Sequence, residues 1–334
     1  MQEQVTVSVV MPVHDGKEYL RPCLESVRSQ TLDAFECICV NDHSTDGARE
    51  VLQEFADGDP RFRVLDSAER GAGAARNLGL AEAKGRYLLF LDADDLFEPT
   101  LLETLSARAE ATEADIVFCP NRIYDTATGV VSDSKIVKFP EIDPAVEYPF
   151  RAEGGPSLMA YAPCPWNKLF RADFVRRERL SFQALPSAND LFFTTTAKIV
   201  AHRCASVSEP LILYRVGQKA NITAKVHKDP SCVAKALLAV WNFIGERGLK
   251  PVMTAKFVGF TCPNIWYTLN LVKEASEARA RFVAFLGESG LVEQMGAAIS
   301  EHCPNDGAAS ESHAKLQTAL SDAAAAYAAM RPQD

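Results

Sequence analysis

The first 120 residues alternate between short apolar runs and longer segments in which apolar residues recur at helical spacing. The runs that predict strands are Val5–Met11, Phe35–Val40, Arg61–Leu65, Tyr87–Leu91 and Ile116–Cys119. Between them, apolar residues lie three and four positions apart, as Val51, Leu52 and Phe55 do, which is the spacing of a helix that buries one face. This alternation predicts an α/β fold: a mostly parallel, Rossmann-like central sheet with flanking helices and right-handed crossovers.

Two prolines and two hydroxyl side chains indicate where the first elements begin and end. Pro12 lacks the N–H that a strand ladder uses, so the first strand is expected to close there. Pro22 suits the first turn of a helix better than its interior, so the first helix is expected to begin near Leu20. Ser44 or Thr45 is the expected N-terminal cap of the second helix, because either hydroxyl can accept a backbone N–H.

The alternation stops after residue 120, and the last third of the chain has a helical pattern. A turn at Asp125–Gly129 is expected to join two extended segments, and the Pro- and Gly-rich stretch Pro140–Pro165 to be mostly loop. Later segments predict a helix, a strand and then four helical stretches: Leu191–Ala201, Leu211–Tyr214, Cys232–Glu246, Pro251–Val272 with an interruption at Pro263, Glu274–Leu286 and Ala308–Met330. We therefore expect an α/β domain at residues 1–220 and an α-helical C-terminal region at residues 221–334.

Three carboxylates, Asp92, Asp94 and Asp95, follow the strand-like run Tyr87–Leu91 within four positions. Ligands of open α/β sheets bind beyond the carboxyl ends of the strands, so all three are expected to face a cleft rather than the core. Two unit charges about 4 Å apart repel by about 4 kcal/mol at an effective dielectric constant of about 20, which favours a cation between them. Carboxylates on a short turn suit Mg²⁺ or Mn²⁺. The alternative is that the acids only begin a solvated loop.

Composition narrows the class of partner and the compartment. The chain of 334 residues carries a formal net charge of −9, which argues against nucleic acid as a partner. The nine scattered cysteines include no Cys-x-x-Cys pair, so reduced, mostly buried thiols are expected. The N-terminus lacks a leader pattern and no run of 18 apolar residues occurs, so we expect a cytoplasmic protein.

One segment departs from the acidic character of the chain. Residues 216–260 hold seven Lys or Arg against two Asp or Glu. A solvated helical face is the favoured interpretation, and peripheral contact with lipid phosphates at the inner face of the membrane is the alternative. The apolar stretch Phe257–Val272 is interpreted as core rather than as a membrane-dipping segment.

The first 215 residues resemble glycosyltransferase family 2, the inverting nucleotide-sugar transferases of GT-A fold. The resemblance covers about two thirds of the chain and rests on seven blocks in order: Val-Ser-Val-Val-Met-Pro-Val-His14, Glu36–Gly47, Gly71–Asn77 with Gly79, Leu91–Asp95, Trp166–Phe170, Asn189-Asp190 and Tyr214-Arg215. Three positions depart from the family pattern: Asn41 and His43 replace an acid and a glycine, and Asn189 replaces the first acid of a Glu-Asp pair.

The resemblance implies a role for several side chains. Pro12, Val13 and His14 would line the nucleotide, Asp42 would accept hydrogen bonds from uracil, and Arg76 would reach the base or the diphosphate. Asp92, Ala93 and Asp94 form the Asp-x-Asp motif; Asp92 and Asp94 would engage the ribose and a Mn²⁺ or Mg²⁺ ion, Asp94 more directly, with Asp95 in a supporting or capping role. Asp190 would be the general base, although as the residue before Leu191–Ala201 it could also cap that helix.

These roles imply a metal-dependent inverting glycosyltransferase that moves a sugar from a UDP-sugar to a glycan or lipid-linked acceptor in surface polysaccharide synthesis. Residues 1–120 would then be the nucleotide-binding half and 121–220 the acceptor-side half. A sugar nucleotidyltransferase is a second hypothesis, but its glycine-rich loop after the first strand is replaced by one glycine, Gly16. A catalytically impaired nucleotide-sugar-binding scaffold is a third, suggested by Asn189. The sugar, the linkage and the oligomeric state stay open.

Overall fold

The computed structural model describes residues 5–134, 158–160, 162–217, 229–272 and 276–330. The chain divides into two compact units: the first comprises Met1–Ala152, Tyr161–Ala184 and Ala197–Lys219, and the second comprises Glu153–Ala160, Leu185–Thr196 and Ala220–Asp334. Each unit is described by itself below. The expected domain boundary at residue 220 stays a prediction, and the second unit also takes in the segment that contains Asn189 and Asp190.

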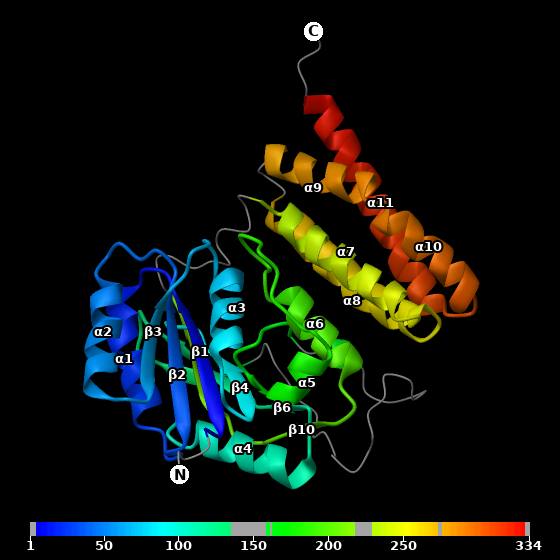
Figure 1. Ribbon diagram of the computed structural model, residues 1–334. Coiled ribbons are helices and arrows are strands. Elements are labelled where there is room, and N and C mark those ends of the chain that lie inside the picture. Colours follow the sequence, from blue (N-terminus) through cyan, green and yellow to red (C-terminus); the bar gives the residue numbers. More distant parts are fainter. Residues whose placement is uncertain (1–4, 135–157, 161, 218–228, 273–275, 331–334) are drawn as a thin grey trace. The chain divides into compact units, whose positions relative to one another are not determined.

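The first unit is built on a seven-stranded mixed sheet (Figure 1). Its strands are β1 (Val7–Val13), β2 (Phe35–Asn41), β3 (Phe62–Asp66), β4 (Tyr87–Phe90), β6 (Ile116–Phe118), β9 (Lys168–Arg171) and β10 (Cys204–Ser206). They lie in the order β10-β6-β9-β4-β1-β2-β3, and β9 is antiparallel to both of its neighbours while the other pairs are parallel. The α/β fold with a mostly parallel sheet is confirmed.

Helices cover both faces of this sheet. They are α1 (Lys17–Arg28), α2 (Ala48–Gly58), α3 (Ala72–Glu82), α4 (Leu101–Thr112) and α5 (Ala172–Arg177), with α6 (Leu191–Val200) beginning in the second unit. The apolar stripes of α1, α2 and α4 share one core with the side chains on one face of β1, including Val9 and Met11. On the other face, α3 approaches β1 so closely that a Cβ on Gly79 would lie 2.4 Å from Cγ1 of Val10. The glycine at position 79 thus sets the helix-to-sheet distance.

Both proline-based expectations are wrong. Pro12 lies inside β1, opposite Val40 of β2. Its missing N–H faces the β4 side, where the register has already ended at Val10 and Phe90, so no ladder bond is lost there. Helix α1 begins at Lys17 rather than near Leu20, which places Pro22 inside the helix.

A smaller sheet of four strands lies in the same unit. It comprises β5 (Leu96–Phe97), β11 (Ile212–Val216), β7 (Asn121–Asp125) and β8 (Val131–Asp133), in that order. The predicted turn at Asp125–Gly129 joins the antiparallel pair β7 and β8, as expected. The rest of the second extended segment, and most of the loop expected at Pro140–Pro165, lie outside the described residues.

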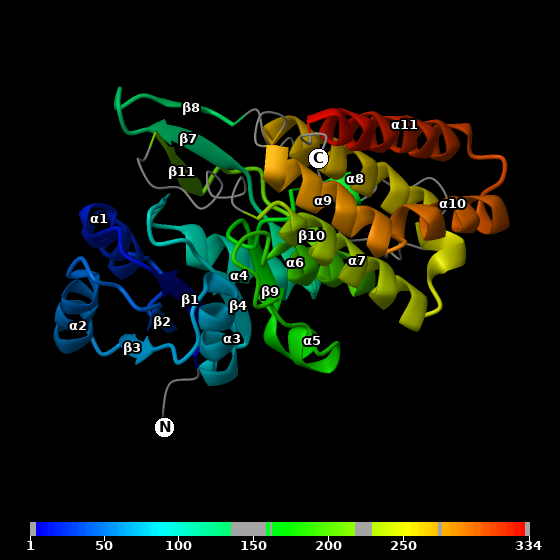
Figure 2. The same ribbon diagram turned by 90° about the horizontal axis from the view of Figure 1, so that it is seen from above.

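The second unit is α-helical (Figures 1 and 2). Its elements are η1 (Leu158–Ala160), α7 (Ser231–Glu246), α8 (Lys250–Leu271), α9 (Ser276–Glu288), α10 (Leu291–His302) and α11 (Gly307–Met330). The Trp241 ring stacks on Phe257 at 5.1 Å between centroids, and its Nε1 donates to Oε1 of Gln294 at 3.1 Å, so one side chain joins α7, α8 and α10. Helix α8 continues through Pro263, so the expected interruption is wrong. Within the described ranges, no helix is both long and apolar enough to cross a bilayer.

Candidate functional site

The loops that follow β1 and β2 are tied together by hydrogen bonds. The Asp42 N–H donates to the Val13 carbonyl at 2.7 Å, and Nδ1 of His14 lies 2.6 Å from the Asp42 carbonyl. The Thr45 N–H donates to Oδ1 of Asp15 at 2.7 Å, a bond that lowers the pKa of the Asp15 carboxyl. Val13, His14 and Asp42, which the resemblance assigned to one nucleotide site, therefore lie together.

The expected cap of α2 is wrong, because the two hydroxyl residues serve these loops instead. Gly47 is the N-cap, and Oδ1 of Asp46 accepts the Ala48 N–H at 2.9 Å. Ser44 accepts the Asp15 N–H at 3.0 Å. Asp46, one residue closer to α2 than Thr45, thus caps the helix.

Asp42 also connects β2 to the start of α3. Both of its carboxylate oxygens lie within hydrogen-bond distance of the Gly71 N–H, at 3.0 and 2.9 Å, and the residue is 5% exposed. Gly71 has φ 113° and ψ 143°, at the border of a region that essentially only glycine occupies. His43 has φ 56°, so the position where the family has a glycine does adopt a left-handed conformation. The second and third sequence blocks thus meet at one carboxylate.

Arg76 is not a surface residue of α3. Its side chain is 6% exposed, its Nη2 lies 2.7 Å from Oδ1 of Asp92, and its guanidinium packs over the Phe182 ring at 5.5 Å from the centroid. Because the Asp92 side chain is 31% exposed, one side of this ion pair faces solvent. The third block therefore places a cation at the first acid of the Asp-x-Asp motif.

The other two acids after β4 differ in environment. Burial, and secondly the charge of Asp92, raise the pKa of the Asp94 carboxyl to about 6. Asp95 is fully buried, and its Oδ1 accepts the Arg215 N–H at 2.8 Å. The expectation that Asp95 faces a cleft is therefore wrong: it joins the turn after β4 to β11. Arg215 also donates from Nε to the Asp94 carbonyl, so the turn is held from two sides.

The acids after β4 decide whether this turn suits a divalent cation. Among the described residues, no group of three or more His, Cys, Asp or Glu is arranged to hold a metal ion by itself. Asp92 and Asp94 remain, and nucleotide sites commonly bind Mg²⁺ through one or two carboxylates plus water and substrate phosphates. Burial first, and then the charge of Asp92, disfavour the ionised form of Asp94 and raise its pKa, a cost that a bound cation would offset. The residues present thus fit a cation shared with a diphosphate.

Asp190 lies in the second unit, immediately before α6. Its carbonyl accepts both the N–H and the hydroxyl of Thr194, at 3.0 and 2.8 Å. Asn189 is 5% exposed and Ala188 has φ 52°, so the turn before the helix contains a buried amide and a left-handed residue. The role of Asp190 as general base stays a prediction.

The fifth and seventh blocks meet in the first unit. Trp166 stacks on Tyr214 with 5.2 Å between ring centroids. Lys168 is fully buried, and its Nζ donates to the carbonyls of Ala162 and Cys164 and to Oδ1 of Asn167, at 3.0, 2.7 and 2.6 Å. Sequence reasoning missed the structural roles of Lys168 and Arg215. Their presence inside the matched blocks was the available signal.

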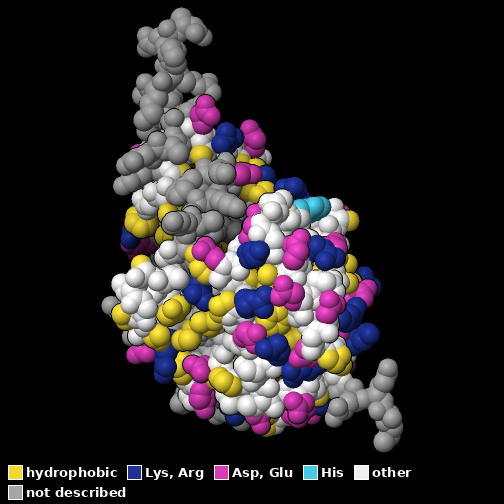
Figure 3. Space-filling view, turned by 90° about the vertical axis from the view of Figure 1, so that its left-hand side faces the viewer, with side chains coloured by type: hydrophobic (Ala, Val, Ile, Leu, Met, Phe, Trp, Pro, Cys, Tyr) yellow, Lys and Arg dark blue, Asp and Glu magenta, His cyan; other side chains and the backbone are white. Residues whose placement is uncertain are grey.

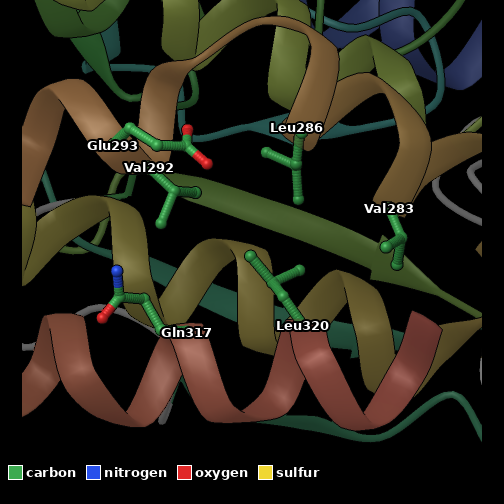
Figure 4. A pocket seen from close by; sticks show the side chains of 7 residues that line it. Val283, Leu286, Val292, Glu293, Gln317 and Leu320 are labelled. Atoms are coloured by element: carbon green, nitrogen blue, oxygen red, sulfur yellow. The ribbon is translucent and has the colours of Figure 1, made fainter. Parts of the chain in front are cut away.

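A pocket of about 170 Å³ lies among α9, α10 and α11 in the second unit (Figure 4). Apolar side chains line most of it, and Glu293 and Gln317 add polar groups. None of the residues assigned from the sequence lines it. It offers one carboxylate and no second charged group, so it lacks the features of a diphosphate site.

A mixed sheet with parallel β1–β4, flanking helices and an Asp-x-Asp turn after β4 defines the class of GT-A glycosyltransferases. Residues 8–167 match the profile of Glycosyl transferase family 2. This part of the chain therefore belongs to glycosyltransferase family 2.

Relatives and solved structures agree with that assignment. EpsH of Bacillus subtilis is 35% identical over 217 residues, covering 64% of this chain and 62% of the relative. The uncharacterized glycosyltransferase YibD of Escherichia coli is 30% identical over 208 residues, covering 62% and 60%. The chain thus spans less than two thirds of the length of both relatives.

Two solved structures resemble the chain over nearly its whole length. A crystal structure of S. aureus TarS with UDP-GlcNAc has a TM-score of 0.70 at 19% identity and covers 96% of this chain and 91% of that one. The mannosyltransferase PcManGT of Pyrobaculum calidifontis with GDP-Man and Mn²⁺ has a TM-score of 0.52 at 18% identity, covering 98% and 88%. At these identities the likeness shows the GT-A fold alone.

Proposed function

We propose that this chain is a metal-dependent inverting glycosyltransferase that moves a sugar from a UDP-sugar to a glycan or lipid-linked acceptor in surface polysaccharide synthesis. The observation that carries the proposal is the set of side chains at the strand ends of the first unit. Asp42 lies beside His14, and the Arg76–Asp92 ion pair precedes the partly desolvated Asp94. The first group of side chains suits recognition of the donor nucleotide, and the second suits departure of the diphosphate.

Recognition of the uracil ring is assigned to Asp42. A carboxylate oxygen has more than one acceptor position, so Asp42 can keep the Gly71 N–H and still accept an N–H from a base. Pro12, Val13 and His14 would flank the nucleotide. The crystal structure of TarS in complex with UDP-GlcNAc supports a uridine donor for this fold.

Two acids and one arginine would bind the diphosphate and its metal ion. Asp94, with Asp92 beside it, would hold Mn²⁺ or Mg²⁺, and the bound ion would supply Lewis-acid stabilisation of the leaving diphosphate. Arg76 orients Asp92 through the 2.7 Å ion pair. Its buried guanidinium adds positive charge at the same place, where a low-dielectric setting strengthens the attraction for phosphate.

Asp190 would accept the proton of the acceptor hydroxyl. Inversion requires a base on the side of the sugar opposite the departing nucleotide. The pKa of an effective general base lies near the pH at which the enzyme works. Leu191 and Phe193, which follow Asp190 in the sequence, are buried. Asn189, in place of the family acid, leaves Asp190 as the one carboxylate of that pair.

Nucleotide release from a panel of sugar nucleotides with Mn²⁺ tests the proposal. Asp94→Ala should abolish turnover and weaken Mn²⁺-dependent nucleotide binding. Asp190→Asn should abolish transfer and leave binding nearly unchanged. Asp33→Asn is the matched control, because Asp33 precedes β2 at the opposite edge of the sheet and its side chain is 97% exposed. Parental transfer by Asp190→Asn would exclude Asp190 as the base.

The same panel separates the alternatives. A scaffold subunit, which Asn189 suggests, would bind a sugar nucleotide and release nothing. A nucleotidyltransferase would require diphosphate or a sugar phosphate. A thermal-shift series should rank UDP above GDP, dTDP and CMP, since a ligand at about a hundred times its Kd stabilises by about 2.7 kcal/mol.

A further inference from the structure

One face of helix α8 is apolar and yet exposed to solvent. In the described part of the chain, five large hydrophobic side chains are exposed, and three of them belong to α8: Val252 at 42%, Trp266 at 61% and Tyr267 at 58%. The opposite side of the same helix packs into the second unit through Phe257, Ile265 and other buried side chains. The packing that holds α8 in the second unit therefore does not use the exposed rings of Trp266 and Tyr267.

These exposed residues form one continuous stripe. At about 100° per residue, the positions fall within about one third of the helix circumference. We call this stripe the outer face of α8, and it consists of Val252, Ala255, Lys256, Gly259, Pro263, Trp266, Tyr267 and Asn270. It runs along nearly the whole length of the helix.

The charge of this face is as unusual as its apolarity. Lys256 is its only charged residue, and α8 as a whole contains Lys250 and Lys256 and no acid. The face in Figure 3, by comparison, shows hydrophobic side chains interspersed with both basic and acidic ones. Lys256 is half-buried, and burial lowers the pKa of its ammonium group. A stripe of this composition favours a partner that is apolar in its interior and negatively charged at its surface.

We propose that the outer face of α8 is a peripheral docking surface for an anionic lipid bilayer, with Trp266 and Tyr267 inserted at the headgroup level. Trp and Tyr favour the membrane–water interface, and lysines beside them can reach lipid phosphates. No described helix can span a bilayer. The proposed association is therefore peripheral. A second copy of the chain fits less well, because the eight residues that form the outer face include Lys256 and no acid, so two such faces would not be complementary in charge.

Vesicle binding tests the proposal without donor or acceptor, so its outcome is independent of the proposed transfer reaction. Trp266 is a specific probe, because the other two tryptophans, Trp166 and Trp241, are 8% and 1% exposed. We expect the full chain to sediment with phosphatidylcholine–phosphatidylglycerol vesicles, and brominated lipids to quench the fluorescence of Trp266. Phosphatidylcholine vesicles alone should bind it more weakly, and added salt should weaken the anionic binding.

Three variants separate the contributions. Trp266→Ser/Tyr267→Ser should lower the partition coefficient about tenfold or more, because both rings would no longer leave water. Lys256→Gln should lower it about fivefold on anionic vesicles and have little effect on neutral ones. Val130→Ser/Val131→Ser is the matched control: it removes two exposed apolar side chains from the β7–β8 hairpin of the first unit and should bind as the parent does. Circular dichroism checks that each variant is folded.

Several outcomes would overturn the proposal. Failure of the parent chain to bind anionic vesicles at low salt is one, and binding that survives the double aromatic substitution is another. A dimer in sedimentation velocity that the same substitution dissociates, without vesicle binding, would assign the face to a second copy. Should the double variant unfold, Trp266→Phe in brominated vesicles replaces it: retained binding with lost quenching supports insertion at position 266, whereas unchanged quenching refutes it.

Discussion

The Gly71→Ala substitution tests whether the link between Asp42 and α3 depends on backbone conformation. Gly71 has φ 113° and ψ 143°, and a Cβ built there would meet nothing within 4 Å. Any loss of stability must therefore come from the conformation of the residue and not from a clash. Gly16 offers the matched control, since its φ of 82° and ψ of 26° are left-handed and its Cβ position is equally open.

The two substitutions should differ in size for a physical reason. An alanine at position 71 that keeps the conformation of Gly71 would cost about 1–3 kcal/mol of stability. An alanine that relaxes would lose the hydrogen bond to the Asp42 carboxylate, which costs about 1.5–3 kcal/mol. Either way, the smaller unfolded-state entropy of alanine returns only about 0.4–1 kcal/mol. Gly71→Ala should therefore destabilise the first unit by about 1–2 kcal/mol. The left-handed region is open to alanine at about 1 kcal/mol, so Gly16→Ala should be nearly neutral.

Amide hydrogen exchange of the buried strands β1 and β2 measures this difference within the first unit, whatever the second unit does. Protection in these strands should fall for Gly71→Ala and hardly change for Gly16→Ala. Calorimetric titration with UDP should also show weaker binding for Gly71→Ala if the residue relaxes, because Asp42 then loses the N–H that orients it. Equal protection of the two variants would refute the conformational argument.

Three further substitutions probe the packing and the buried cations of the first unit. Gly79→Ala should cost about 1–3 kcal/mol because its Cβ would overlap Val10, and combining it with Val10→Ala should give a favourable coupling of about 1 kcal/mol or more in a denaturation cycle. Lys198 is fully buried and burial lowers the pKa of its ammonium group, so the unfolded chain binds more protons and stability rises with pH above the folded pKa; Lys198→Met should flatten this rise in urea denaturation series between pH 7 and pH 9. Lys168→Met should instead destabilise by about 1–3 kcal/mol, because three oxygens lose their donor; a neutral result in urea denaturation would contradict this.

The sequence predicted those parts of the fold that depend on local pattern. Apolar runs gave the strands around β1 and β4, and the spacing of Val51, Leu52 and Phe55 gave the buried face of α2. The candidate donor site could be predicted from the sequence for a related reason. Parallel strands have their carboxyl ends at the same edge of the sheet, so the acids that follow β2 and β4 lie on the same side. No knowledge of side-chain contacts was needed for that step.

What the sequence did not predict depends on partners that are distant along the chain. Pro12 is tolerated in β1 because β4 ends beside it, and the length of β4 is not encoded near residue 12. Pro263 stays within α8 because the buried side chains of the same helix, such as Phe257 and Ile265, pack into the second unit. This tertiary packing outweighs the local preference for a break at proline. Helix α10 was missed as a separate element, although Gly290 precedes it in a left-handed conformation typical of a helix boundary.

Asp95 shows how the same limit affects the site. Its position in a run of acids after a strand made it equivalent to Asp92 and Asp94 by pattern, yet the backbone N–H that it accepts comes from Arg215, 120 residues later. That contact fixes the turn and so the direction in which Asp94 points. If the Asp-x-Asp turn binds a cation and a diphosphate, its geometry depends on strand β11 as much as on its own three acids. Substitutions in β11 should then alter donor binding even though β11 supplies no residue that the motif itself contains.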